Sequence, residues 1–98
     1  MLCFLSSRRL KPGAWEDFRK AWEPEEWPPQ FIRAYHVRDV NDENHVISFG
    51  LGEGSAADLE QMRESIDQGE RERQERMAQF VDSTQIDGIF EVIDEVTP

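Results

Sequence analysis

The stretch that decides the fold is FIRAYHVRDVNDENHVISFGL, residues 31–51. Its two ends, 31–40 and 45–51, are rich in β-branched and aromatic residues, which fit the pleated and partly buried surface of a strand. The four residues between them, 41–44, are Asn, Asp, Glu and Asn, a composition typical of a turn. The stretch therefore predicts an antiparallel β-hairpin.

A four-residue loop also sets the register of this hairpin, because Val40 then pairs with His45. The pairs expected further along are Tyr35 with Gly50, His36 with Phe49, and Val37 with Ser48. The second strand presents Ile47, Phe49 and Leu51 on one face and Val46, Ser48 and Gly50 on the other. Neither face of this strand consists only of polar residues. We therefore expect both faces to be covered, one by helices and one by a partner subunit.

On the N-terminal side of the hairpin, the chain predicts one strand and one helix. Residues 2–10 begin with a continuous apolar run and read as a strand, which Lys11-Pro12-Gly13 ends in a turn. Trp15, Phe18 and Trp22 then recur at i, i+3 and i+7, which is one face of a helix. The segment 23–30 holds three prolines and is expected to be irregular.

On the C-terminal side, the chain predicts a longer helix and a last strand. Ser55 with Asp58 three residues later resembles a helix N-cap, and Gly69 is expected to bend or divide the helix. The residues expected to face inward from this helix are Leu59, Met62, Ile66, Met77, Phe80 and Val81. Residues 86–96 read as the last strand, in which Gly88 marks a bulge or a close approach of backbones.

The resulting order, β-α-β-β-α-β, predicts an α+β fold of the ferredoxin-like type, with a four-stranded antiparallel sheet. We expect residues 1–98 to form one domain. With a net charge of −10, the chain is expected to repel nucleic acids and anionic membranes. The single cysteine, Cys3, excludes an intrachain disulfide. No signal peptide or membrane span is recognisable, so a cytoplasmic protein is expected.

Metal and nucleophile sites are not expected from the sequence. His36 and His45 are predicted to lie on the same hairpin face but too far apart to share a zinc ion. Ser6 and Ser7 have no base predicted nearby. What remains is a pocket for a flat hydrophobic molecule, for which the candidate lining residues are Trp22, Trp27, Arg33, Tyr35, His36 and Arg73.

Two alternatives to this pocket stay open. The aromatic rings are also explained by packing in the core and between subunits, and His36 by a structural hydrogen bond. Arg73 falls on the inward stripe of the long helix, one turn before Met77. It either pairs with Glu70 at the rim or contacts an anionic oxygen of a ligand.

Three segments of the chain resemble the antibiotic biosynthesis monooxygenase-like group. They are the turn Lys11-Pro12-Gly13 before a Trp/Phe helix, the central hairpin, and the closing DGIFEV of residues 87–92. The resemblance implies a dimeric α+β barrel. The group includes cofactor-independent oxygenases that act on aromatic polyketides or quinols, and haem-degrading enzymes. The haem degraders have a strand-one asparagine where this chain has Ser6-Ser7, a histidine and a tryptophan near the second helix, and a tryptophan at the position of Leu51. No haem or other cofactor is therefore expected.

The resemblance leaves two functions open. One is a cofactor-independent oxygenase acting on an aromatic or quinol-type small molecule, with His36 or Arg73 handling the proton. The other is a non-catalytic binding or accessory protein on the same scaffold, because a fold does not establish a function.

Overall fold

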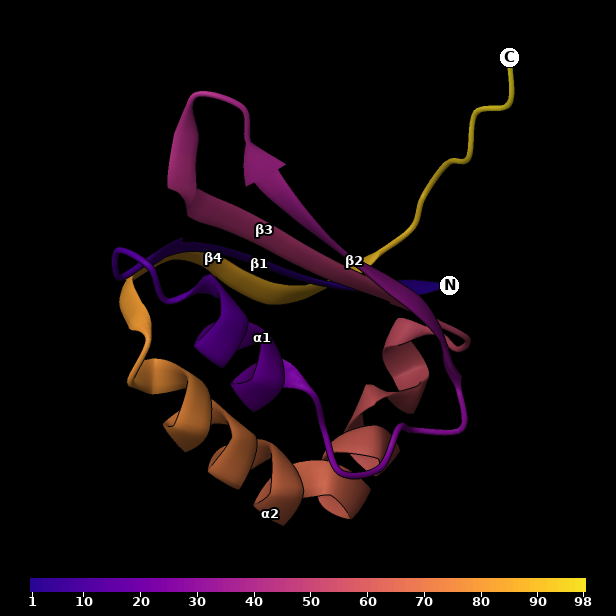
Figure 1. Cartoon of the computed structure of the whole chain (residues 1–98). Helices are drawn as coiled ribbons and strands as arrows, with labels where there is room; N and C mark the ends of the chain where they lie inside the picture. The colour runs from indigo at the N-terminus through magenta and orange to yellow at the C-terminus, as the bar shows by residue number, and fades with distance from the viewer.

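The computed structural model describes the backbone of all 98 residues and the side chains of residues 1–59 and 69–98. Its elements follow the predicted order and form one antiparallel sheet, in which the strands lie side by side as β2-β3-β1-β4. The two helices cover the same face of the sheet (Figure 1). The elements are β1 (Leu2–Leu10), α1 (Trp15–Trp22), β2 (Phe31–Asp39), β3 (Asp42–Gly52), the short 3-10 turn η1 (Ala56–Asp58), α2 (Leu59–Ala78) and β4 (Val81–Glu91). The ferredoxin-like α+β fold is thus confirmed.

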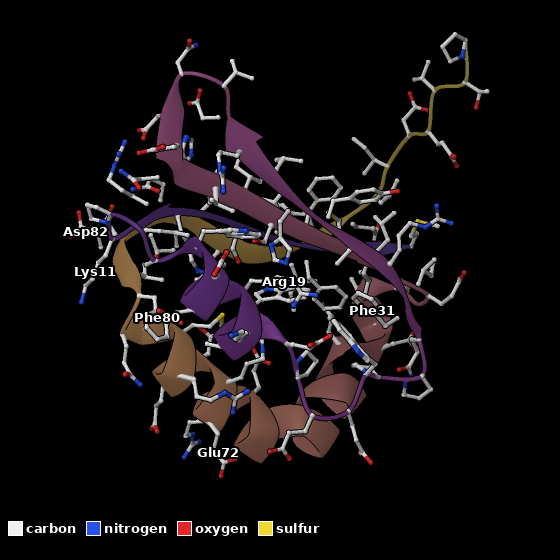
Figure 2. The ribbon with its side chains drawn as sticks, viewed as in Figure 1. Lys11, Arg19, Phe31, Glu72, Phe80 and Asp82 are labelled. Atoms are coloured by element: carbon white, nitrogen blue, oxygen red, sulfur yellow. The ribbon has the colours of Figure 1, made fainter. Side chains whose placement is uncertain are left out.

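The first strand and first helix have the bounds that the sequence predicts. Gly13 adopts a positive φ of 75° in the turn between them, a conformation that glycine reaches without a steric penalty. Further on, the backbone N–H of Lys11 donates to the carbonyl of Phe80 at 3.0 Å, which ties the end of β1 to the end of α2 (both residues are labelled in Figure 2). This hydrogen bond therefore connects the two β-α units at one end of the sheet.

The register predicted for the central hairpin is wrong by one residue. The turn contains only Val40 and Asn41, and Asp39 pairs with Asp42. Residues 43–45 then have no partner on β2, because the next pair is Arg38 with Val46. The pairs that follow are His36 with Ser48, Tyr35 with Phe49, and Val37 with Ile47. His36 and His45 consequently lie on opposite faces of the sheet, not on one face.

The last strand also differs from the prediction, since it spans Val81–Glu91 rather than residues 86–96. It pairs with β1 along its whole length, from Leu10 opposite Val81 to Leu2 opposite Glu91. Beyond the strand, the backbone N–H of Val92 donates to the carbonyl of Met1 at 3.0 Å, and the residues that follow extend away from the sheet (Figure 1). The irregularities in this pairing lie between Ser7 and Arg8 and between Arg9 and Leu10, not at Gly88.

The second helix begins after a hydrogen-bonded cap. The backbone N–H of Ser55 donates to Asp58 at 2.9 Å, and the Ser55 hydroxyl donates to the same carboxylate oxygen at 3.1 Å. This bears out the predicted cap, although it opens the 3-10 turn that precedes α2. α2 runs through Gly69 without a break. The predicted inward positions Met62 and Ile66 lie outside the described side chains.

The core lies between the helices and one face of the sheet, which we call the closed face. Its buried cluster comprises Leu10, Phe18, Ala21, Val46 and Met77. Trp15, Trp22, Phe80 and Val81 pack against this cluster.

The opposite face of the sheet, here the open face, carries no helix (Figure 1). Its four most exposed hydrophobic side chains are 44–48% accessible: Tyr35, Val37, Ile86 and Phe90. Ile47, Phe49 and Leu51 alternate on β3 with the closed-face residues and are half-buried. Within the described part of the chain, no helix is long and apolar enough to cross a membrane.

Candidate functional site

His36 is the polar centre of the closed face. The observed register places it opposite Ser48, and its Nδ1 atom lies 2.7 Å from the Ser48 hydroxyl. Three rings of α1 surround the imidazole, with centroid separations of 4.3 Å to Trp22, 5.2 Å to Trp15 and 6.4 Å to Phe18. All three meet it edge to face, an arrangement that aromatic quadrupoles favour.

This environment keeps His36 neutral. Burial, followed by the positive charges of Arg19 and Arg8, lowers the pKa of its imidazole to about 4. Its Nε2 atom is buried and has no hydrogen-bond partner among the described residues. A buried polar atom without a partner costs free energy, and in native proteins such an atom often marks a place for a ligand or an ordered water.

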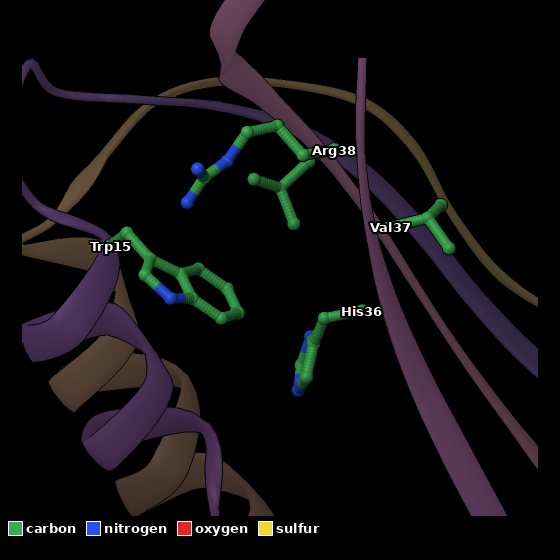
Figure 3. A pocket seen from close by; sticks show the side chains of 5 residues that line it. Trp15, His36, Val37 and Arg38 are labelled. Atoms are coloured by element: carbon green, nitrogen blue, oxygen red, sulfur yellow. The ribbon is translucent and has the colours of Figure 1, made fainter. Parts of the chain in front are cut away.

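A pocket with a volume of about 150 Å³ adjoins His36. Its lining residues are Trp15, His36, Val37, Arg38 and Val46 (Figure 3). Drug-sized ligands occupy roughly 300–1,000 Å³. A cavity of about 150 Å³ is known to accept a molecule of the size of benzene. The pocket therefore has room for a single aromatic ring.

Trp22 connects three of the six predicted site residues with one another. Its ring lies 4.3 Å from His36 and 5.6 Å from Trp27, measured between centroids. The guanidinium of Arg73 lies 5.8 Å from the same ring, and its Nη1 donates to the Trp22 carbonyl at 2.8 Å. Trp27 in turn packs on Phe31 at 4.4 Å. Trp22, Trp27, His36 and Arg73 thus form one continuous cluster.

Arg73 is held by protein groups within this cluster. Its Nε and Nη2 atoms donate to the two carboxylate oxygens of Glu70, at 3.0 and 2.8 Å. Burial opposes ionisation of Glu70, but the hydrogen bonds from Arg73 and Gln74 outweigh it and lower the pKa of that carboxyl group. Of the two readings of Arg73, the structure shows pairing with Glu70, and Arg73 does not line the pocket beside His36.

The other two predicted residues lie on the open face. Tyr35 stacks on Phe49 with centroids 5.3 Å apart. Arg33 pairs with Leu51 and shares the face of Tyr35. Successive strand residues point to opposite sides of a sheet, so His36 cannot share a site with its neighbour Tyr35 in one subunit.

Of the residues that line the pocket, only His36 was among the six sequence candidates, and Ser48, which is the hydrogen-bond partner of His36, was not among them either. Arg38 follows His36 by two positions on β2, so the period of a strand could have placed both on one face. Trp15 was recognised as one of the aromatic rings on the inward face of the first helix but was not among the six candidates. Ser48 could not be paired with His36, because the predicted register placed Phe49 there.

On the open face, the expectation that Ser7 lacks a nearby base is wrong. The Oγ atom of Ser7 lies 2.8 Å from Nε2 of His45. The two residues are 38 positions apart and meet because β1 pairs with β3. Among the described residues, no three His, Cys, Asp or Glu side chains gather in a group that could hold a metal ion.

Comparison with solved structures places this fold beside two proteins of similar size. The first, from Chloroflexus aurantiacus J-10-fl, is described as a "putative Antibiotic biosynthesis monooxygenase"; it has a TM-score of 0.71 and 9% identity, over 98% of this chain and 96% of that one. The second, from Nitrosomonas europaea, has the same description, a TM-score of 0.67 and 13% identity, over 96% of this chain and 100% of that one. No protein-family model and no curated protein sequence matches the chain. At these identities the likeness establishes the fold.

Proposed function

We propose that the chain is a homodimeric protein of the antibiotic biosynthesis monooxygenase-like group that binds a single-ring phenol or quinol beside His36. The observation that carries the proposal is a pocket of about 150 Å³ lined in part by His36, a residue whose buried Nε2 atom has no hydrogen-bond partner among the described residues. The fold shared with the two solved structures supports membership of the group.

The chemistry of the ligand follows from the groups around the pocket. Trp15 offers a flat apolar surface, and Arg38 lies 5.8 Å above its ring. The neutral imidazole can accept a hydrogen bond from a hydroxyl group through Nε2, if its Nδ1 proton is donated to Ser48. An aromatic ring with one or two hydroxyl groups satisfies both features, because it fills an apolar space and supplies the missing donor.

The homodimer is proposed from the open face. Four hydrophobic side chains there are nearly half exposed, in the company of three half-buried ones on β3. An apolar sheet surface of this kind requires a cover, and a second copy of the same surface supplies one of matching shape and polarity. Stacking two such faces would produce the dimeric α+β barrel.

Titration calorimetry with hydroquinone and with benzene tests the ligand site. We expect hydroquinone to bind more tightly than benzene in the wild-type protein, and His36→Phe to remove that preference while keeping an aromatic ring in place. Equal binding of both compounds to the wild type would contradict the role given to His36 Nε2. Tyr35→Phe, on the opposite face, is the control and should leave the preference unchanged.

Oxygenation is the second candidate function, and the position of Arg38 favours it. Without a cofactor, the bound phenol or quinol must itself lose a proton and reduce O₂, and a guanidinium beside the pocket would stabilise the resulting phenolate. The pKa of about 4 makes His36 a weak proton acceptor near neutral pH, which favours binding over proton abstraction. Oxygen uptake that depends on the quinol and is lost in Arg38→Met would establish the oxygenase; binding without uptake would establish the accessory role.

A further inference from the structure

Residues 92–98, which we call the arm, leave the sheet on the side of the open face (Figure 1). The start of the arm is fixed, because the backbone N–H of Val92 donates to the carbonyl of Met1 at 3.0 Å. Two of its hydrophobic side chains are almost wholly exposed, Ile93 at 93% and Val96 at 80%. The arm therefore extends the exposed apolar surface that the proposed homodimer would cover.

The arm begins level with an arginine at the opposite edge of the sheet. One row of pairing partners crosses the four strands next to their end: Phe90, Cys3, Leu51 and Arg33. Arg33 is exposed on the open face, and within the described part of the chain no acidic group forms an ion pair with its guanidinium. The open face thus has a cation at the β2 edge and, at the β4 edge, an arm that contains Asp94 and Glu95.

The charges of the two edge strands decide between two ways of stacking the open faces. A two-fold axis relates the subunits of a homodimer, and stacked sheets keep their strands roughly aligned. With the axis across the strands, β4 would lie over the partner's β4, a strand with three acidic residues and no basic one. With the axis along the strands, β4 lies over the partner's β2, which carries two arginines and one aspartate. The second arrangement is favoured because it avoids the contact between like charges.

The arm has the length that this arrangement requires. Stacked sheets lie about 10 Å apart, and an extended chain advances roughly 3.3 Å per residue. Asp94 is three residues past Glu91, the last residue of β4, so an extended arm brings its carboxylate to the level of the partner's sheet. A rotation about an axis along the strands keeps the same ends of the two sheets together. Arg33 of the partner subunit therefore lies at the end of the sheet that the arm reaches.

We infer that the arm of each subunit crosses to its partner and that Asp94 forms an ion pair with Arg33 of the partner subunit. Ile93 on the same arm then packs against the partner's Ile32 and the partner's Tyr35, which are 38% and 47% exposed in the single chain. Because of the two-fold symmetry, each contact occurs twice. The inference rests on the proposed homodimer and specifies which strands face each other in it.

Charge reversal, followed by mixing of two variants, tests whether this ion pair joins two subunits. Arg33→Glu and Asp94→Arg each create two like-charge contacts in their own homodimer, and we expect the dimer dissociation constant of each to rise about 10-fold. In a one-to-one mixture, the heterodimer has one original and one reversed pair, both of opposite charge. Native mass spectrometry of the full-length chains should therefore find more heterodimer than random pairing gives.

Two control variants change equally exposed positions away from the contact. Lys20→Glu reverses a charge on α1, on the other side of the sheet, so its dimer dissociation constant should equal that of the wild type. Its mixture with Asp94→Arg should pair at random, because the heterodimer then keeps one like-charge contact. Ile93→Ser should also weaken the dimer, whereas Val40→Ser should not, although Val40 is 96% exposed in the hairpin turn.

Either of two results would overturn the inference. One is random pairing in the mixture of Arg33→Glu with Asp94→Arg. The other is a dimer dissociation constant in both variants equal to that of the wild type. If the wild type is dimeric in the same experiment, the proposed homodimer stands and only the arm contact fails; a monomeric wild type would overturn both. None of these results affects the calorimetric test of the His36 pocket.

Discussion

The two faces of the sheet differ in how far the chain itself covers them, and the side chains of β3 show the difference. Toward the helices it presents the buried Val46, Ser48 and Gly50. On the other side it presents large side chains, Ile47, Phe49 and Leu51, which the chain itself leaves half-covered. A Cβ on Gly50 would come within 3.0 Å of the Phe31 ring. Gly50 thus leaves room for a ring that the chain itself supplies, whereas the large side chains on the opposite face have no helix above them. These exposed apolar side chains on the open face are the basis of the proposed homodimer.

The same contrast separates the polar residues. His36 on the closed face is desolvated and held neutral, whereas Asp39 and His45 at the hairpin end are open to solvent and hydrogen-bonded to each other. On the closed face, burial thus changes the pKa of a polar side chain, whereas on the open face the polar side chains hydrogen-bond to each other in contact with solvent. The predictions below test this difference.

Truncation on the closed face should have the largest effect on stability. Phe18 is fully buried, so Phe18→Ala should lower the free energy of unfolding by about 3–5 kcal/mol. Phe90→Ala on the open face, where the ring is 48% exposed, is the comparison. Its loss should be smaller and should depend on protein concentration. Urea unfolding at two protein concentrations measures both losses. If only the loss for Phe18→Ala depended on protein concentration, the closed face and not the open face would be the subunit interface.

A charge on the open face should weaken the dimer and spare the fold. Phe49→Lys places two like charges in the stacked faces, and we expect the dimer dissociation constant to rise about 100-fold, or ~2.7 kcal/mol. Val40→Lys is the control, because Val40 is 96% exposed in the hairpin turn. Sedimentation equilibrium reads the constant and circular dichroism the fold. If Phe49→Lys and Val40→Lys had the same dimer dissociation constant, the open face would not be the dimer interface.

Acid should destabilise the closed face through His36. The folded chain binds this proton near pH 4 and the unfolded chain near the ordinary value of 6.5, so between these values the unfolded state binds more protons. Stability is then fully present above pH 6.5 and falls as the pH drops toward 4. Because His36 is only half-buried, we expect roughly 1–2 kcal/mol for this contribution. In His36→Gln this part of the pH dependence should vanish; an unchanged slope in that variant would assign it elsewhere.

The smallest of these effects concerns Arg73. Arg73→Met retains the apolar stem but removes the hydrogen bonds to Glu70 and to the Trp22 carbonyl, and should cost about 1–2 kcal/mol. Arg76→Met, one turn onward and with a single contact of 3.4 Å to the Glu23 carbonyl, should cost less than about 0.5 kcal/mol. Thermal unfolding of the two variants measures these losses of stability. Equal losses would contradict the structural role given to Arg73.

The sequence predicts this fold because its local signals agree with its tertiary structure. The Trp/Phe stripe and the Pro-Gly turn locate α1, and the hairpin run identifies β2 and β3. The register was missed because the polar residues 42–44 were assigned to the turn, while in the structure they belong to β3, and residues 43–45 have no partner on β2. Nothing local distinguishes these two states.

The sites were harder to predict for a related reason. His36 and Trp22 were grouped because a histidine among aromatic residues is visible in the sequence, and their rings do lie 4.3 Å apart. Tyr35 and Arg33 were grouped with them although strand alternation separates the faces. The contact of Ser7 with His45 depends on β1 pairing with β3, a long-range arrangement that no spacing along the chain reveals.

The central claim, that the open face is covered by a second copy, is tested most directly by sedimentation velocity of the wild-type chain at micromolar concentration. We predict one species of twice the 11.5 kDa chain mass, which dissociates on dilution. The Phe49→Lys variant should sediment as the monomer under the same conditions. A wild-type chain that remains at 11.5 kDa throughout would contradict the claim.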